Sequence, residues 1–259
     1  MWHSLRRRHL STNFPDGYGK TVLSEVDSTN AHALRIAKTA RGPEWILGLK
    51  QTQGRGRRGR PWADPTGNFA ATLLLFPNDT LDQIALRSFV AACALYQTFI
   101  DVLGDQAELS LKWPNDVLLN DRKVAGILLE TQILGPQSVA LAIGIGVNLR
   151  HAPQPDQLEA RAVAPVSIWE QTQVTITPEA FLDALATQYH AFETQFTTLG
   201  FAPIRAFWLS HAARLGEVIT ARVADREITG TFDTVDETGH LILVTDQGRE
   251  TIAAADIFF

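Results

Sequence analysis

The sequence predicts an α+β protein in which a mostly antiparallel sheet is flanked by helices and followed by a small C-terminal β-barrel. Three observations lead to this fold class. Apolar residues recur at helical spacing in two long segments, 81–103 and 178–199. Short β-prone runs follow one another between 109 and 149, with turn residues between them. After residue 214 the pattern changes to short alternating runs, which are typical of a small barrel.

The N-terminal part predicts a helix followed by two strands. Ser28 or Thr29 offers a hydroxyl that can cap this helix, and the Gly-Pro pair at 42–43 ends it. The apolar runs at 45–50 and 69–76 predict strands. The long helix at 81–103 should be buried, which places Cys93 in the core.

The rest of the chain predicts hairpins, two helices and the barrel. The hairpin strands are separated by Asn-Asp and Gly-Pro turns and are predicted at 109–112, 116–119, 124–133 and 139–149. Helices are predicted at 178–199 and 204–211, and short strands at 217–223, 227–235, 241–245 and 251–255. We therefore expect a larger domain over residues 1–211 and a barrel domain over residues 212–259.

Composition excludes several classes of protein. A hydrophobic fraction of 45% with 20% charged residues is ordinary for a soluble globular chain. The net charge of −5 argues against general nucleic-acid affinity. One cysteine can form no intramolecular disulfide and no four-thiolate zinc site. We find no uninterrupted apolar run of the ~18 to 20 residues that a membrane span needs, and no secretory signal.

These features predict a cytoplasmic protein with no membrane attachment. Arg6, Arg7 and Arg8 faintly resemble a transit peptide, but a short solvated arm is the commoner explanation of three arginines.

The segment from Gly54 to Arg60 alternates four arginines with three glycines. Glycine lets the backbone approach a ligand closely, and guanidinium groups bind carboxylate or phosphate oxygens through paired hydrogen bonds. The pattern therefore favours an anion clamp. A solvated basic hairpin and an arginine-rich RNA-binding segment are the alternatives.

A second cluster runs from Lys112 to Gly126, with the sequence KWPNDVLLNDRKVAG. Lys123 directly precedes a strand that should be buried, so its ammonium group can point into a site. Asn115 and Asp116 stand at a strand entrance, where they could orient a ribose, a phosphate or a hydrated magnesium ion. A plain turn is the alternative for these two residues.

A third cluster, GIGVN at 144–148, ends an apolar strand. A tightly packed strand is one interpretation of it, and a pocket at the end of the strand that contains Asn148 is the other. It is no dinucleotide fingerprint, because no G-x-G-x-x-G is completed. The seven histidines show no metal-binding spacing, so we predict no zinc site. No nucleophile elbow or activated cysteine setting is present, so the chemistry should be electrostatic and positional.

With these three clusters in order on one chain, the sequence resembles the biotin protein ligase family, closely over 25–149 and more loosely in the terminal barrel. The resemblance implies a fold like that of class II aminoacyl-tRNA synthetases, followed by an SH3-like barrel. It also implies the family reaction. Biotin and ATP, with Mg²⁺, give biotinyl-5′-AMP and pyrophosphate, and a lysine of the biotin carboxyl carrier domain of a carboxylase then takes the biotin.

The resemblance also implies roles for individual residues. Biotin contacts are expected from Ser28, Thr29, Asn30, Gln51, Arg55, Gly56, Arg57, Lys123 and Gly126. ATP contacts are expected from Arg57, Arg58, Arg60, Trp62, Asn115, Asp116, Lys123 and Asn148. Lys123, Arg57 and Arg55 are the catalytic candidates, because they would neutralise charge that builds on the α-phosphate. Trp169 is a candidate for stacking on adenine.

Partners and alternatives follow from the same resemblance. Some family members carry an N-terminal DNA-binding domain, but about two dozen residues precede Glu25 here, so we expect no DNA binding. The family allows a homodimer, and no sequence feature decides it. A lipoate or octanoate ligase or transferase of related fold is the main alternative, and the polar Ser-Thr-Asn segment favours biotin over it. An RNA-binding module is a second alternative, disfavoured by the net acidity.

Overall fold

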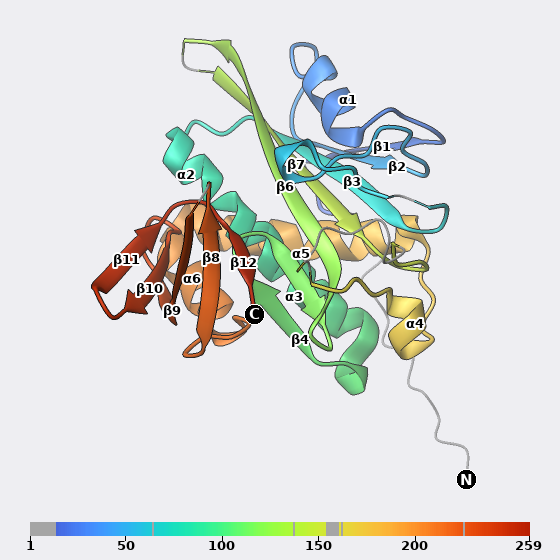
Figure 1. The fold of residues 1–259 in the computed structure, drawn as a ribbon. Coiled ribbons are helices and arrows are strands. Elements are labelled where there is room, and N and C mark those ends of the chain that lie inside the picture. Colours follow the sequence, from blue (N-terminus) through green and yellow to red (C-terminus); the bar gives the residue numbers. More distant parts are fainter. Residues whose placement is uncertain (1–13, 64, 137, 154–160, 162, 225) are drawn as a thin grey trace.

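The computed structural model describes residues 14–259 except 64, 137, 154–160, 162 and 225, and it contains two sheets (Figure 1). The larger sheet has seven strands in the order β1-β2-β3-β7-β6-β5-β4. All neighbouring pairs are antiparallel except β1 and β2. Its strands are β1 (Gly19–Leu23), β2 (Glu44–Gly48), β3 (Phe69–Leu75), β4 (Leu109–Lys112), β5 (Asp116–Leu119), β6 (Arg122–Gly135) and β7 (Ser138–Val147).

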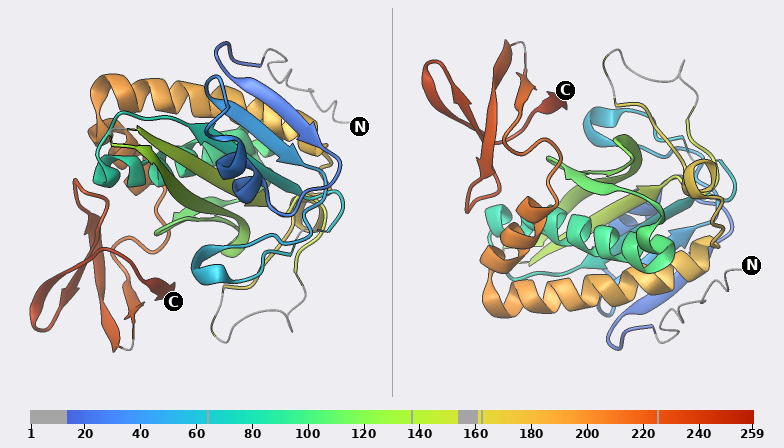
Figure 2. Two further views of the ribbon diagram at one scale, coloured as in Figure 1. Left: turned by 90° about the horizontal axis from the view of Figure 1, so that it is seen from above. Right: turned by 90° about the horizontal axis from the view of Figure 1, so that it is seen from below.

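Helices cover both faces of this sheet (Figure 2). The short helix α1 (Thr29–Ile36) contacts β3 and β7 on one face, while α3 (Arg87–Leu103) and α5 (Pro178–Leu199) pack together on the other. The remaining helices are α2 (Leu81–Ala85), α4 (Ile168–Thr172) and α6 (Phe201–Ser210), with single 3-10 turns η1 (Arg57–Gly59) and η2 (Gly104–Gln106). The sheet is therefore the middle layer of the larger unit.

The main core lies between the sheet and the helices α3 and α5. Trp45, Phe69, Phe99 and Phe181 are fully buried there, and Phe69 and Phe181 meet edge to face with ring centroids 5.0 Å apart. Cys93 is also fully buried, as predicted, and burial raises the pKa of its thiol well above the ordinary value.

The C-terminal sheet has five antiparallel strands in the order β11-β10-β9-β8-β12. Its strands are β8 (Val218–Val223), β9 (Arg226–Val235), β10 (Leu241–Thr245), β11 (Gly248–Ile252) and β12 (Asp256–Phe258). Trp113 joins the two units by donating its indole N–H to the carbonyl of Gly239 at 3.0 Å. This arrangement agrees with the small C-terminal barrel that the sequence predicts, whereas the boundary between residues 211 and 212 stays a prediction.

The predicted fold class is confirmed, with a few local differences. The single helix predicted over 81–103 is two helices that meet at Leu86. Strands β1 and β12 and helix α4 were not predicted. The arginine-rich arm at residues 6–8 lies outside the described residues.

The segment Leu81–Leu103 departs from the expectation that no stretch could span a membrane. Over the residues described, it is long and apolar enough by length and composition to do so. However, 67% of its apolar window is buried inside the protein, against the sheet and α5. Its hydrophobicity is that of a core helix.

Candidate active site

A cavity opens where strands β3, β6 and β7 meet the start of α1 and the arginine-rich loop. The loop, which we define as residues 54–62, covers one side of it. The cavity is lined by Ser28, Thr29, Asn30, Gln51, Arg55, Gly56, Trp62, Ala70, Lys123, Gly126, Ile127, Leu128, Gly144, Ile145 and Gly146. Residues from all three sequence clusters thus meet at one place.

One wall of the cavity is polar and belongs to the start of α1. Ser28 is the N-cap, and its side chain accepts a hydrogen bond from the backbone N–H of Ala31. The Oε1 atom of Gln51 accepts the backbone N–H of Thr29 at 2.9 Å. Ser28 and Thr29 are at most 4% exposed. This wall is therefore a set of fixed, desolvated hydrogen-bonding groups.

Two glycines of β7 in the cavity lining leave room for neighbouring side chains. A Cβ atom at Gly144 would lie 2.3 Å from Oδ1 of Asn30, and one at Gly146 would lie 2.4 Å from Cε2 of Trp62. Neither distance is sterically allowed, so only glycine at these two positions of β7 lets Asn30 and Trp62 pack against the strand. The sequence had left this cluster between strand packing and a site role.

Lys123 lies at the mouth of the cavity, as its place before a buried strand predicts. Its Nζ lies 2.7 Å from a carboxylate oxygen of Asp116 and 5.6 Å from the ring centroid of Trp62. Its side chain is 29% exposed, so solvent and a ligand can both reach it. Cation, carboxylate and aromatic ring thus stand side by side.

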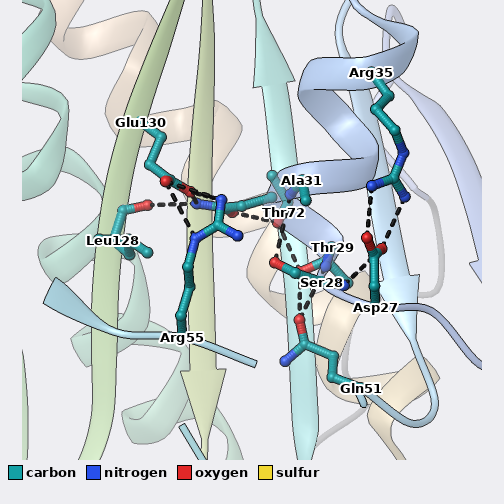
Figure 3. Close-up of polar contacts among 11 residues, drawn as sticks. Asp27, Ser28, Thr29, Ala31, Arg35, Gln51, Arg55, Thr72, Leu128 and Glu130 are labelled. Carbon is teal, nitrogen blue, oxygen red and sulfur yellow. Dashed lines mark hydrogen bonds and ion pairs between the residues drawn. The ribbon is translucent and has the colours of Figure 1, made fainter. Parts of the chain in front are cut away.

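The first part of the loop is held to the large sheet. Arg55 donates to both carboxylate oxygens of Glu130 on β6, at 3.0 and 3.1 Å (Figure 3). Arg57 is half-buried and donates to Asn115 Oδ1 at 3.3 Å and to the carbonyl of Ala255. Burial lowers the pKa of Arg57, while Asp116 and Asp256 oppose that effect, and the group stays cationic.

The second part of the loop is held to the C-terminal sheet. Arg58 and Arg60 approach Oδ2 of Asp256 on β12 at 2.5 and 2.9 Å, and Arg222 does so at 3.0 Å. Burial alone would raise the pKa of Asp256, but the hydrogen bonds from Arg60 and Arg222 and the nearby charges lower it to about 2. Arg58 and Arg60 do not line the cavity in this conformation.

The residues expected near ATP fall into two groups. Asp116 contacts Lys123, and Asn115 accepts from Arg57 and donates to Ile127 O at 2.6 Å, but neither Asn115 nor Asp116 lines the cavity. Asn148 is 1% exposed and donates to Val166 O, and its Oδ1 has no hydrogen-bond partner among the described residues. Trp169 lies on α4 beside Arg150 and does not line the cavity.

Sequence reasoning missed three residues around this site, and it gave no role to a fourth, Lys112, which begins the second sequence cluster. Thr72 and Glu130 contact the polar wall, Asp256 holds the loop, and Lys112 is 8% exposed with its Nζ 5.6 Å from the Phe259 ring. Burial lowers the pKa of Lys112, and Asp116 opposes this. Thr72 interrupts an apolar strand, and that single polar position was the available signal.

Comparison with known proteins identifies relatives of both units. Residues 22–148 match the biotin/lipoate A/B protein ligase family, and residues 215–259 match the biotin protein ligase C-terminal domain. A biotin--[acetyl-CoA-carboxylase] ligase from Paracoccus denitrificans is 50% identical over 92% of this chain and 99% of its own length. A bifunctional ligase/repressor from Bacillus subtilis is 32% identical over 91% of this chain and 71% of its own length.

Solved structures agree in fold. The biotin protein ligase from Aquifex aeolicus in complex with biotin and ATP has a TM-score of 0.76 at 24% identity, over 92% of this chain and 97% of that one. The enzyme from Leishmania major in complex with biotinyl-5-AMP has a TM-score of 0.66 at 22% identity, over 93% of this chain and 100% of that one. Taken with the sequence matches, these similarities place the chain in the biotin protein ligase family.

Proposed function

We propose that this protein joins biotin to ATP to form biotinyl-5′-AMP and then transfers biotin to a lysine of a carboxylase's biotin carboxyl carrier domain. The observation that carries the proposal is a single cavity whose lining brings three features together. These are the polar wall at the start of α1, the indole of Trp62 packed against Gly146, and the ammonium group of Lys123. Family membership and the name of the Paracoccus relative support the same reaction.

The polar wall suits the ureido ring of biotin. A cyclic urea carries one carbonyl and two N–H groups, so it needs both donors and acceptors from the protein. Ser28, Thr29 and Gln51 supply such groups in a buried setting, where an unmatched ligand leaves them unpaired at a cost of ~1 to 3 kcal/mol. Gly126 and Trp62 supply an apolar surface for the thioether ring.

The mouth of the cavity suits the first chemical step. An oxygen of the biotin carboxylate attacks the α-phosphorus of ATP, and the bond to the pyrophosphate oxygen breaks. Both reactants are anions, so cations must offset their repulsion. Lys123 and Arg57 would stabilise the charge that develops on the α-phosphate. Arg55 would remain in the cavity lining, where Glu130 holds it.

The nucleotide side is supported by a buried acceptor and a carboxylate. We propose that Asn115 and Asn148 contact the nucleotide, since the Asn148 Oδ1 still lacks a partner among the described residues. Mg²⁺ usually keeps several waters and binds phosphates with one or two carboxylates. Asp116, beside Lys123, is the carboxylate that would hold it there. Gly56 already lines the cavity, and Arg58 and Arg60, which Asp256 holds beside it, would contact the nucleotide where it extends beyond the cavity.

The second step needs a neutral lysine amine from the acceptor. It attacks the carbonyl of the mixed anhydride, AMP leaves, and an amide bond to biotin forms. Loop 54–62 would exclude water from this anhydride before transfer, because water competes for the same carbonyl. We further propose that the protein works in the cytoplasm without binding DNA, with a homodimer as the assembly to test.

The reaction is tested by incubating the protein with ATP, Mg²⁺ and either biotin or lipoate and measuring pyrophosphate. Release with biotin and none with lipoate is the expected result. Release with lipoate alone would reject the proposal in favour of the lipoate ligase alternative. The RNA-binding alternative predicts salt-dependent retention on RNA, although Arg55, Arg58 and Arg60 already pair with carboxylates here.

A further inference from the structure

A fully buried hydroxyl lies directly behind the polar wall of the cavity. Thr72 on β3 is 0% exposed, and its Oγ1 lies 2.8 Å from Thr29 Oγ1 (Figure 3). The same oxygen lies 2.6 Å from Asn30 Oδ1. Thr29 and Asn30 line the cavity, whereas Thr72 does not. Thr72 can therefore influence a ligand only through the orientation of its two neighbours.

The surroundings of Asn30 fix which way its amide faces. Its Nδ2 lies 2.8 Å from Glu130 Oε2 and 3.3 Å from the backbone carbonyl of Leu128. A carboxylate and a carbonyl can only accept hydrogen bonds, so the NH₂ group must face them. The Asn30 oxygen then faces Thr72, and that oxygen can only accept.

The single proton of Thr72 is thereby committed to Asn30. Two oxygens 2.6 Å apart must share a proton, and Asn30 Oδ1 has none to give. With the Thr72 proton directed at Asn30, the 2.8 Å contact between the two threonine oxygens is a hydrogen bond when the Thr29 hydroxyl rotates to donate to Thr72. Gln51 Oε1 is a second acceptor within reach of the Thr29 hydroxyl, but it is farther away, at 3.2 Å, and it already accepts the Thr29 backbone N–H at 2.9 Å. The Thr72 oxygen is therefore the nearer acceptor for the Thr29 hydroxyl.

We propose that Thr72 is a specificity-determining positioning residue. Its oxygen accepts the hydrogen bond from the Thr29 hydroxyl, so Thr29 presents only its oxygen lone pairs to the cavity. Thr29 then selects a ligand that offers an N–H group. Glu130 completes this chain of hydrogen bonds, because its carboxylate holds the Asn30 amide and Arg55 together. The inference rests on the proposed function, in which the selected N–H belongs to the cyclic urea of biotin.

The chain of hydrogen bonds explains how the site would refuse a related acid. The dithiolane of lipoate has no N–H to offer, so Thr29 would keep a buried, unpaired acceptor. A hydroxyl that was free to rotate would instead adapt to either ligand. Fixing the direction of the Thr29 hydroxyl proton therefore makes Thr29 selective for ligands that donate an N–H group.

The test combines three variants with altered ligands, and dissociation constants are measured by calorimetry with the full-length protein. Thr72→Val keeps the side-chain shape and removes the hydroxyl, and Thr72→Ser keeps the hydroxyl. Thr98→Val is the matched control, since Thr98 is equally buried but bonds Ala94 O within α3. The ligands are biotin and its two derivatives that carry a methyl group on one or the other ureido nitrogen.

We expect Thr72→Val to weaken biotin binding roughly tenfold or more, with Thr72→Ser and Thr98→Val within about twofold of the wild type. Wild-type protein should reject at least one methylated derivative strongly, and Thr72→Val should lose most of that discrimination. The affinity for ATP should not change. The loss of discrimination against the methylated derivatives distinguishes a change in the orientation of the Thr29 hydroxyl from a simple loss of packing.

Several outcomes would overturn the inference. Unchanged biotin binding in Thr72→Val, or undiminished discrimination against the methylated derivatives, would do so while leaving the proposed function intact. If Thr72→Val does not fold, Asn30→Leu tests the same chain of hydrogen bonds, because it removes the acceptor that fixes the Thr72 proton. Wild-type protein that does not bind biotin would reject the proposed function, and this inference with it.

Discussion

Asp256 on β12 accepts a hydrogen bond from Arg60 in the arginine-rich loop at 2.9 Å, across 196 residues of sequence. The same carboxylate is also approached by Arg58 and Arg222. The C-terminal sheet therefore holds one end of loop 54–62, while Glu130 on β6 holds the other through Arg55. In this conformation the two carboxylates hold the loop against the cavity, which Arg55, Gly56 and Trp62 help to line.

Replacing Asp256 should change how the enzyme uses ATP. Asp256→Asn leaves Arg58 and Arg60 without their common anion, so the loop should open more readily. We expect a KM for ATP that rises several-fold and faster cleavage of the loop by trypsin, both at temperatures well below the melting transition. Steady-state kinetics and limited proteolysis measure both effects. Asp246→Asn, at an exposed aspartate in the turn between β10 and β11, is the control, and equal behaviour of the two variants would contradict a specific role.

The same contact should be sensitive to acid. The pKa of Asp256 is lowered from 3.8 to about 2, so the folded state favours the charged form. The resulting stability, at most about 2.5 kcal/mol, is present above pH 4 and is lost as pH falls towards 2. Wild-type protein should therefore melt above Asp256→Asn at pH 6, and the gap should shrink between pH 4 and 2. A gap that stays constant over this range would refute the assignment.

Lys123 should matter for chemistry and not for folding. Lys123→Ala removes the cation beside Asp116 and Trp62 at the cavity mouth. Adenylate formation should fall roughly 10²- to 10³-fold, as when a group that stabilises transition-state charge is lost. A single-turnover assay with labelled ATP measures this step. Lys38→Ala, at an exposed position, should retain full activity, and the same activity in Lys123→Ala would show that Lys123 is only a surface group.

Gly146 should tolerate no side chain. The methyl group of Gly146→Ala would lie 2.4 Å from Cε2 of Trp62, so the indole must move out of the cavity wall. We expect a loss of ~1 to 3 kcal/mol in stability and a raised KM for biotin. Thermal melting and steady-state kinetics report the two effects separately.

Two further variants check the cause of that effect. Gly135→Ala has nothing within 4 Å of the added carbon and should behave as the wild type. Combining Gly146→Ala with Trp62→Ala should restore part of the lost stability, because the clash is gone. If the double variant loses as much free energy of unfolding as the two single variants lose together, or more, steric conflict with Trp62 is not the cause.

The sequence predicted elements whose signals are local. Ser28 caps α1 as its hydroxyl suggests, and Lys123 stands at the cavity mouth because it directly precedes a buried strand. The break between α2 and α3 at Leu86 was missed because the apolar residues keep the same helical spacing on both sides of it. Strand β1 was missed because its residues are mostly exposed, so no apolar alternation marks it.

The missed site residues depend on contacts across the fold. Glu130 looks like the polar face of a strand, and only the structure brings it to Arg55, 75 residues away. Asp256 belongs to the other sheet altogether. Whether Thr72 belongs to core or site depends on the register of β3 against β7, since Thr72 pairs with Gly144, the glycine that makes room for Asn30. Pairing of this kind is a property of the folded sheet.

The burial of Cys93 has a practical consequence for observing the loop. It is the only cysteine of the chain, and burial keeps its thiol protonated and shielded from reagents. A thiol-reactive fluorophore should therefore label Gln53→Cys alone, at an exposed position just before the arginine-rich loop. Opening and closing could then be followed in real time as biotin and ATP are added, with no background from the native thiol.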